Sequence, residues 1–199
     1  MKILNLYAGI GGNRELWGDK HEITAVEYKQ DIANKYQSLF PNDKVIVEDA
    51  HQYLLEHYKN FDFIWSSPPC PTHSTTNYFT QVIRKKPVYP DMNLYKEIIF
   101  LTHFYKGKFC VENVKSYYDP LIKPQHIGRH YLWANFIIPK IEQPKKTIGN
   151  MMQEKGNIAC KKPLEERNKC DAKLGLHILN RAMDIVTQTK YEQTHLFFE

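Results

Sequence analysis

The chain has 199 residues, of which 42% are apolar and 25% charged, and its formal net charge is +5. This composition is typical of one globular domain with a full core, and no apolar run is long enough to cross a bilayer. Four cysteines without a Cys-x-x-Cys pair argue against a disulfide framework and against a zinc site. Because the N-terminus lacks the layout of a signal peptide, we expect free thiols, no membrane association and a cytoplasmic location.

The first element is a predicted strand at Lys2–Tyr7, followed at once by the glycine-rich turn Ala8–Gly12 and by a helix start at Asn13–Trp17. A strand, a glycine-rich turn and a helix start form the geometry of a nucleotide-binding loop, in which glycines let the backbone approach a ligand. A plain tight turn explains the same glycines equally well.

Two further strand and helix units follow. Glu22–Glu27 is a predicted strand whose last acid lies where dinucleotide-binding folds place a ribose-binding carboxylate, although a solvated glutamate is the simpler reading. Apolar residues at helical spacing predict a helix over Gln30–Phe40, which Pro41 ends. Val45–Glu48 is the third predicted strand, and a short helix is predicted at Tyr53–Tyr58.

The fourth predicted strand, Phe61–Trp65, is a short apolar run typical of a buried strand in a parallel sheet. Pro68 and Pro69 lack an N–H and fix φ, so the strand ladder cannot continue past Ser67. Cys70 therefore lies at the carboxyl edge of the sheet, where open α/β sheets bind ligands, and is placed like a nucleophile. The alternative is a small buried apolar cysteine.

The remaining chain continues the alternation of strands and helices. Pro71–Pro90 is a predicted long loop, either a lid beside the site or an ordinary solvated loop. The later predicted elements are a helix at Met92–Tyr105, strands at Lys108–Glu112 and Arg129–Ile138, and a helix at Leu174–Gln188. We therefore expect a mostly parallel, doubly wound α/β sheet in one domain covering 1–199, with a short irregular insert at 139–172 and a tail at 189–199.

Four stretches, in this order, resemble the signature motifs of the DNA cytosine-5 methyltransferases: Leu6–Gly12, Ser67–Cys70, Val111–Val114 and Gln125–Arg129. The specific part of the match is Pro-Pro-Cys followed by Glu-Asn-Val one βα unit later. The resemblance covers 1–138 and, more loosely, the last helix. It implies the Rossmann-like fold of S-adenosylmethionine-dependent methyltransferases and methylation of cytosine C5 in DNA, in a bacterial or phage-infected cell.

The resemblance also assigns the chemistry. Cys70 would add to C6 of a flipped-out cytosine so that C5 can take a methyl group, and its surroundings would have to favour the thiolate. Glu112 would hydrogen-bond or protonate N3, Asn113 would orient the turn, and Arg129 would stabilise charge near O2. We assign structural roles to the other thiols and to one histidine, namely Cys110, Cys160, Cys170 and His73.

Binding residues follow from the same resemblance. Gly9, Gly11 and Gly12 would wrap the methionine part of S-adenosylmethionine, and Glu27 would bind its ribose. Its adenine would lie against Tyr28 and Asp49, and the remaining residues expected near it are Tyr7, Ala8, Ala50 and Pro68. The residues expected near DNA, with the loop Pro71–Pro90 closed over the flipped base, are Ser74, Arg84, Lys85, Lys86 and Gln125.

The chain departs from the family pattern in four places. Pro71 stands where a glutamine is usual, and Ile127 stands where the first arginine of Gln-x-Arg-x-Arg is expected. The segment between Glu112 and Gln125 is short enough for a strand to be missing. The stretch 139–172 is too short for the usual target-recognition domain, as in small phage-type members. We therefore expect target recognition to be very short, absent or supplied by a partner.

Alternatives remain open for the tail and for the function. Gln193–Phe198 resembles the peptide by which bacterial proteins dock on the replication sliding clamp, but a pattern this short is common by chance, and packing of the tail on the domain itself is the favoured reading. Methylation of RNA would use the same residues, and a non-catalytic DNA-binding module could keep the fold. The joint presence of Cys70, Glu112 and Arg129 favours an enzyme, whereas Ile127 favours the module.

Overall fold

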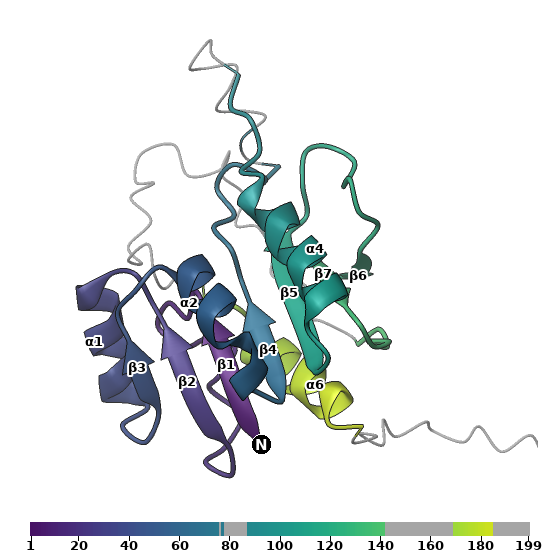
Figure 1. Cartoon of the computed structure of the whole chain (residues 1–199). Helices are drawn as coiled ribbons and strands as arrows, with labels where there is room; N and C mark the ends of the chain where they lie inside the picture. The colour runs from purple at the N-terminus through teal and green to yellow at the C-terminus, as the bar shows by residue number, and fades with distance from the viewer. Residues whose placement is uncertain (76, 78–86, 142–168, 185–199) are drawn as a thin grey trace, which may run out of the picture.

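The computed structural model describes residues 1–75, 77, 87–141 and 169–184 (Figure 1). Its seven strands are β1 (Lys2–Leu6), β2 (Glu22–Val26), β3 (Lys44–Ile46), β4 (Phe63–Ser66), β5 (Lys108–Val114), β6 (Gln125–Ile127) and β7 (His130–Ala134). Its helices are α1 (Gln30–Leu39), α2 (Ala50–His57), α4 (Asn93–Phe104) and α6 (Ala172–Ala182), with a 3-10 turn at Tyr58–Asn60.

The strands form one sheet in the order β3-β2-β1-β4-β5-β7-β6. β1 to β5 are parallel, and β7 runs antiparallel to both β5 and β6. The strand order changes direction between β1 and β4, which are direct neighbours. In open α/β sheets such a switch point opens a crevice at the carboxyl ends of the strands, so the topology alone places a ligand site there. The expected doubly wound sheet is confirmed.

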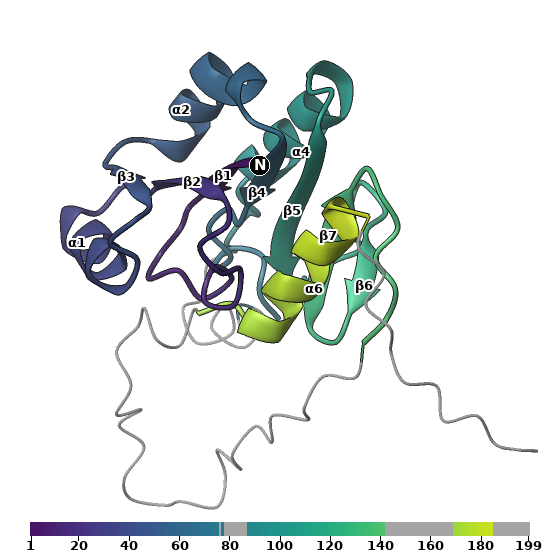
Figure 2. The ribbon, with the colours of Figure 1, turned by 90° about the horizontal axis from the view of Figure 1, so that it is seen from below.

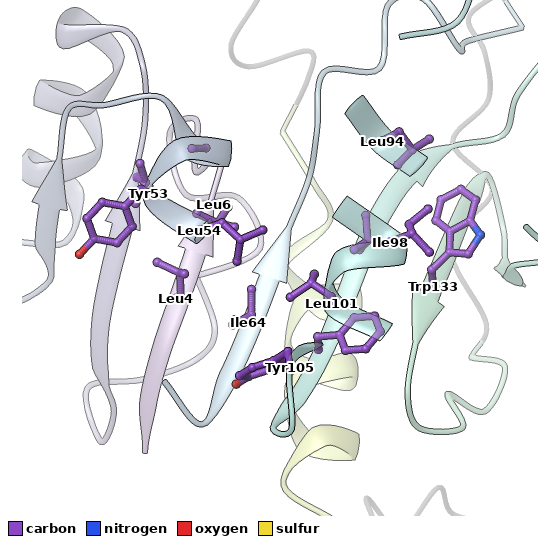
Figure 3. Packing of buried hydrophobic residues seen from close by; sticks show 14 of the residues in the cluster. Leu4, Leu6, Tyr53, Leu54, Ile64, Leu94, Ile98, Leu101, Tyr105 and Trp133 are labelled. Carbon is purple, nitrogen blue, oxygen red and sulfur yellow. The ribbon is translucent and has the colours of Figure 1, made fainter. Parts of the chain in front are cut away.

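Helices cover both faces of the sheet, as Figure 2 shows: α2 and α4 lie on one face, α1 and α6 on the other. Side chains alternate between the faces along each strand. Leu4 and Leu6 pack with α2 and α4, as Figure 3 shows for that core, whereas Ile3 packs with α6. Burial on both faces explains why the central strands are continuous apolar runs.

Some predicted boundaries are wrong for identifiable reasons. The helix start predicted at Asn13–Trp17 is a series of turns, in which the amides of Gly11, Arg14 and Trp17 each bond to the carbonyl three residues earlier. α2 begins at Ala50 because Asp49 accepts a hydrogen bond from the Gln52 amide at 2.9 Å and caps the helix. The strand predicted to reach Ile138 ends at Ala134, and the three-residue β6 is present although no strand was predicted there.

The turns after the glycine loop are held by a buried ion pair. Arg14 Nε and Nη2 bond the two oxygens of Asp43 at 2.8 and 2.9 Å, and the Tyr36 hydroxyl donates to the same carboxylate at 2.8 Å. Both charged side chains are almost fully buried. This ion pair joins the connection between β1 and β2 to the residue before β3. The turns that it stabilises stand where the sequence pattern predicted a helix.

Several expectations fall outside the described residues. These are most of the loop Pro71–Pro90, most of the insert at 139–172, Cys160, the end of the last helix and the tail with Gln193–Phe198. The three cysteines that are described have free thiols, as expected. None of the described helices has the length and apolar character needed to span a membrane.

Candidate active site

A cavity of about 550 Å³ opens at the carboxyl ends of the central strands. This volume is within the range of small-molecule sites. Eleven of the predicted site residues line it: Tyr7, Ala8, Gly9, Gly12, Glu27, Pro68, Cys70, Ser74, Glu112, Asn113 and Arg129. These residues come from the ends of β1, β2, β4 and β5 and from the turn before β7. The topology therefore brings them together at the switch point of the sheet.

Five predicted residues do not line the cavity. Gly11 faces the aromatic rings of α1, since an added Cβ would lie 2.3 Å from the Phe40 ring, and its φ of +78° suits glycine. Asp49 caps α2, and Ala50 is buried in the core beneath it. The other two are Tyr28, which is 74% exposed, and Gln125, which bonds backbone groups of Phe136 and Ile138. The predicted DNA contacts Arg84, Lys85 and Lys86 lie outside the described residues.

The glycine loop is fixed to the end of the second strand. Gly9 has a φ of +53°, and its amide donates to Glu27 Oε2 at 3.0 Å. The other carboxylate oxygen of Glu27 accepts from the Lys29 amide at 3.0 Å. A carboxylate oxygen can accept more than one hydrogen bond, so Glu27 keeps acceptor capacity toward the cavity.

A buried carboxylate on α4 holds two of the strand ends. Glu97 is fully buried; one of its oxygens accepts from the Tyr7 hydroxyl and the other from Ser66 Oγ, the latter at 2.5 Å. Burial and the neighbouring Glu97 charge raise the pKa of Tyr7, so its hydroxyl stays a donor. Tyr7 precedes the glycine loop, and Ser66 precedes the Pro-Pro-Cys turn. Glu97 therefore fixes the position of the glycine loop relative to that turn.

The Pro-Pro-Cys turn is held from both sides. Asn113, at the end of β5, donates from Nδ2 to the Pro68 carbonyl at 2.9 Å within the buried interior. The Cys70 carbonyl accepts from the amides of His73 and Ser74, both at 3.0 Å. The half-buried thiol of Cys70 is therefore presented to the cavity on a backbone with little freedom.

The surroundings of Cys70 oppose the thiolate in the protein alone. Burial raises the pKa of its thiol and the negative charge of Glu112 adds to this, while a backbone hydrogen bond and Arg129 act in the opposite direction. In the protein alone, the surroundings therefore do not supply the activation that the thiol needs. The thiol needs a further change, such as neutralisation of Glu112 or the arrival of a ligand, to become a good nucleophile.

This balance predicts opposite effects of two substitutions on Cys70. Glu112→Gln removes a negative charge beside the thiol, so its pKa should fall and its alkylation by iodoacetamide at pH 8 should become about two- to tenfold faster. Arg129→Gln should raise the pKa and slow alkylation by a smaller factor, since Arg129 is exposed and screened by solvent.

The measurement is the alkylation rate of the Cys70 peptide by mass spectrometry between pH 6 and pH 10. Glu56→Gln makes the same charge change on an exposed face of α2 and serves as the control, with no expected shift. A shift of both cavity variants in the same direction would contradict the electrostatic explanation.

Glu112, the residue expected to contact N3 of the nucleobase, has a hydrogen-bond partner at each of its carboxyl oxygens. Glu112 Oε1 lies 2.6 Å from His130 Nδ1, and Oε2 accepts from Ser67 Oγ at 3.0 Å. The side chains of His130 and Glu112 are 5% and 9% exposed. Glu112, Cys70 and Arg129 thus face one cavity: a thiol, a carboxyl group held by two donors and an exposed guanidinium.

Comparison with known proteins identifies the family. The model of the C-5 cytosine-specific DNA methylase family matches residues 1–125. The chain belongs to this family. A curated relative, the Type II methyltransferase M.Bsp6I of Bacillus sp. (strain RFL6), is 35% identical over 81 residues, which are 39% of this chain and 25% of the relative. The match therefore spans about a quarter of that protein's length.

Solved structures that resemble the chain include methyltransferases. A SAM-dependent methyltransferase from Agrobacterium tumefaciens is 13% identical, with a TM-score of 0.44 and coverage of 59% of this chain and 40% of that one. A putative DNA modification methyltransferase encoded within a prophage of E. coli is 20% identical, with a TM-score of 0.40 and coverage of 60% and 33%. The parallel order of β1 to β5, with helices on both faces of the sheet, is the expected Rossmann-like arrangement.

The structure also adds cavity residues that sequence reasoning missed. His130 directly follows Arg129. Side chains alternate between the two faces along a strand, so His130 lies on the same face as the buried Leu132, which pairs with Glu112. Lys169 and Cys170 precede α6 and pass over the glycine loop, where a Cβ on Gly12 would lie 2.6 Å from the Cys170 carbonyl. No local signal predicts this crossing. Cys170, which was assigned to structure, therefore lines the cavity.

Proposed function

We propose that this protein transfers a methyl group from S-adenosylmethionine to C5 of cytosine in DNA. The observation that carries the proposal is the convergence of Cys70, Glu112 and Arg129 on the cavity that the glycine loop also lines. Membership of the cytosine-5 methylase family supports it. Since its substrate would be DNA, we also place the activity in the cytoplasm of a bacterial or phage-infected cell.

The first half of the cavity fits the cofactor. When bound, S-adenosylmethionine supplies an electrophilic methyl group. Glu27 offers carboxylate oxygens for ribose hydroxyls, and Gly9 leaves open space where another residue would carry a Cβ. Tyr7 is fixed by Glu97 at the same edge and can pack against the ligand. These groups bind and orient, and they leave Cys70 free for the base.

The second half of the cavity fits a cytosine. C5 of cytosine is a poor nucleophile, and addition of the Cys70 thiolate to C6 makes it enamine-like. Glu112 is placed to engage N3 as charge develops there, and Arg129 adds positive charge near the ring. Because C5 and C6 are inaccessible inside a duplex, the base has to leave the stack before it can reach the cavity.

Covalent trapping tests the proposal. The protein is incubated with S-adenosylmethionine and oligonucleotides that contain 5-fluorocytosine, as duplex DNA, single-stranded DNA or RNA. Fluorine at C5 blocks the final elimination, so we expect an adduct with DNA that resists denaturation and is seen by mass spectrometry. An adduct with RNA alone would instead assign the activity to RNA.

The absence of an adduct with every oligonucleotide, while S-adenosylmethionine still binds, would contradict catalysis by the chain alone. It would favour a non-catalytic module or an enzyme that requires a recognition partner. Cofactor binding is measured separately by calorimetry, so a misfolded sample is not mistaken for an inactive one.

A further inference from the structure

Glu112, the acid of the proposed reaction, accepts the last of two consecutive hydrogen bonds that start at Trp65. Trp65 Nε1 donates to Ser67 Oγ at 2.7 Å, and Ser67 Oγ donates to Glu112 Oε2 at 3.0 Å. An indole N–H can only donate, which leaves the Ser67 hydroxyl proton for the carboxylate. Glu112 therefore accepts at Oε2, and the proton on this side of the carboxyl group belongs to Ser67.

The partner at the other oxygen is His130, and the sheet fixes this pair. Glu112 lies opposite Leu132 in the antiparallel register of β5 and β7, and Val114 lies opposite His130. Directly opposite residues share a face, so Glu112 and His130 are diagonal neighbours on the face covered by α6, within reach for long side chains. His130 also lines the cavity, and only 4% of its surface is exposed.

The short contact between the two side chains requires a proton. His130 Nδ1 and Glu112 Oε1 are 2.6 Å apart, and without a hydrogen between them two lone pairs would face each other. In the described part of the chain, His130 is the one titratable group that contacts the carboxylate of Glu112. The other donor, Ser67, does not titrate in the working range.

Cytosine needs a proton that a carboxylate does not have. When the Cys70 thiolate adds to C6, the C5=C6 electron pair moves to C4–C5 and the C4=N3 pair moves to N3, which must then gain a proton. Three thiols lie near the pair: Cys70, Cys110 and Cys170. Burial, followed by the Glu112 charge, raises the pKa of each above the usual value for cysteine, so each holds its proton more tightly than an imidazolium does.

We infer that His130 holds the proton that cytosine N3 gains, and delivers it through Glu112. This inference rests on the proposed methylation of cytosine. As the Cys70 Sγ–C6 bond forms, Glu112 takes the Nδ1 proton of the His130 imidazolium, which becomes neutral imidazole, and passes a proton on to N3. When Cys70 is eliminated, the proton returns by the same route. His130 does not touch the base, so it is a positioning residue that acts through Glu112.

Two variants of His130 separate proton storage from simple hydrogen bonding. His130→Asn places an amide nitrogen at the same number of bonds from Cβ as imidazole Nδ1, so it keeps a donor toward Glu112 but has no proton to give up. His130→Leu removes both properties. We expect both variants to form the adduct with 5-fluorocytosine DNA at least about tenfold more slowly than wild type at saturating DNA.

Affinity for S-adenosylmethionine and the DNA concentration for half-maximal rate should stay unchanged in both variants. His126→Asn is the matched control, because His126 lies on the neighbouring strand β6, packs on Tyr131 and does not line the cavity. We expect this control to react like wild type. His130→Asn reacting as fast as wild type would overturn the inference, as would an equal loss in His126→Asn.

A measurement on wild type keeps the inference testable if the variants fold poorly. In protein labelled with nitrogen-15 at histidine, the two ring nitrogens of His130 should both be protonated in the complex before addition and only one in the trapped adduct. An imidazolium that persists in the adduct would overturn the inference. Wild type that forms no adduct with DNA would count against the proposed function itself, and the two failures are therefore distinguishable.

Discussion

Replacing Asp43 by alanine is expected to lower the free energy of unfolding by about 3–5 kcal/mol. Arg14 would then be left almost fully buried without the carboxylate that both its Nε and its Nη2 contact. Burial alone would lower the pKa of Arg14, but its hydrogen bonds to Asp43 outweigh this and raise it. The charge would persist in the variant, and its desolvation would no longer be offset.

Urea unfolding followed by circular dichroism measures this loss, with the slope of the transition checked for two-state behaviour. Asp19→Ala is the matched control, because Asp19 is the other partner of Arg14 and its side chain is 75% exposed. We expect that control to change stability by no more than about 0.5 kcal/mol. Equal effects of the two substitutions would contradict the importance of burial.

The Asp43 variant has a second expected consequence, at the site. The ion pair fixes the turns that follow the glycine loop, so its loss should weaken S-adenosylmethionine binding even at temperatures where the protein remains folded. Calorimetric titration of the folded variant measures this. A folded variant with unchanged affinity for S-adenosylmethionine would show that the ion pair does not affect cofactor binding.

The parts of the fold that could be predicted are those specified by short-range pattern. The apolar runs that became β1, β4 and β5 are long enough to be read as buried strands, and helical spacing located α1 and α4 to within a residue of their ends. The alternation of strands and helices then determined the topology. Because the topology places strand ends together, Cys70 and Glu112 could be assigned to one cavity before any contact was known.

The errors arise where distant residues decide the local structure. Turns replace the helix expected after the glycine loop, and Arg14 is held there by a residue 29 positions later. Gly11 was assigned to a ligand, but it makes room for the rings of α1. Cys170 reaches the cavity only because the chain before α6 crosses the glycine loop. None of these contacts has a signature within a window of neighbouring residues.

The presence of two thiols in one cavity leads to the largest effect that we expect on activity. Cys70→Ala should abolish methyl transfer to DNA, with a rate at least about a thousandfold below wild type, because no other group could form the bond to C6. Cys170→Ala should still form the covalent adduct. The geometry decides between them: Cys70 shares its end of the cavity with Arg129 and Glu112 on a fixed turn, whereas Cys170 lies over the glycine loop.

Electrostatics favours the same thiol. Burial, and after it the charges of Glu112 and Asp171, raise the pKa of Cys170 well above its ordinary value, and Arg129 offsets only part of this. The pKa of Cys70 is also raised, but its half-buried thiol feels fewer negative charges. Glu112 is neutral only while it carries the proton that passes to N3, and this removes one of the two causes that raise the pKa of Cys70, so thiolate formation and base activation become coupled.

The measurement is single-turnover transfer of a labelled methyl group, with the adduct on 5-fluorocytosine DNA mapped to a peptide by mass spectrometry. Cys70→Ala should bind S-adenosylmethionine with wild-type affinity, because Cys70 is needed for the base and not for the cofactor. An adduct that survives in Cys70→Ala and disappears in Cys170→Ala would move the nucleophile to the segment before α6. The roles of Glu112 and His130 would then have to be reassigned around that thiol.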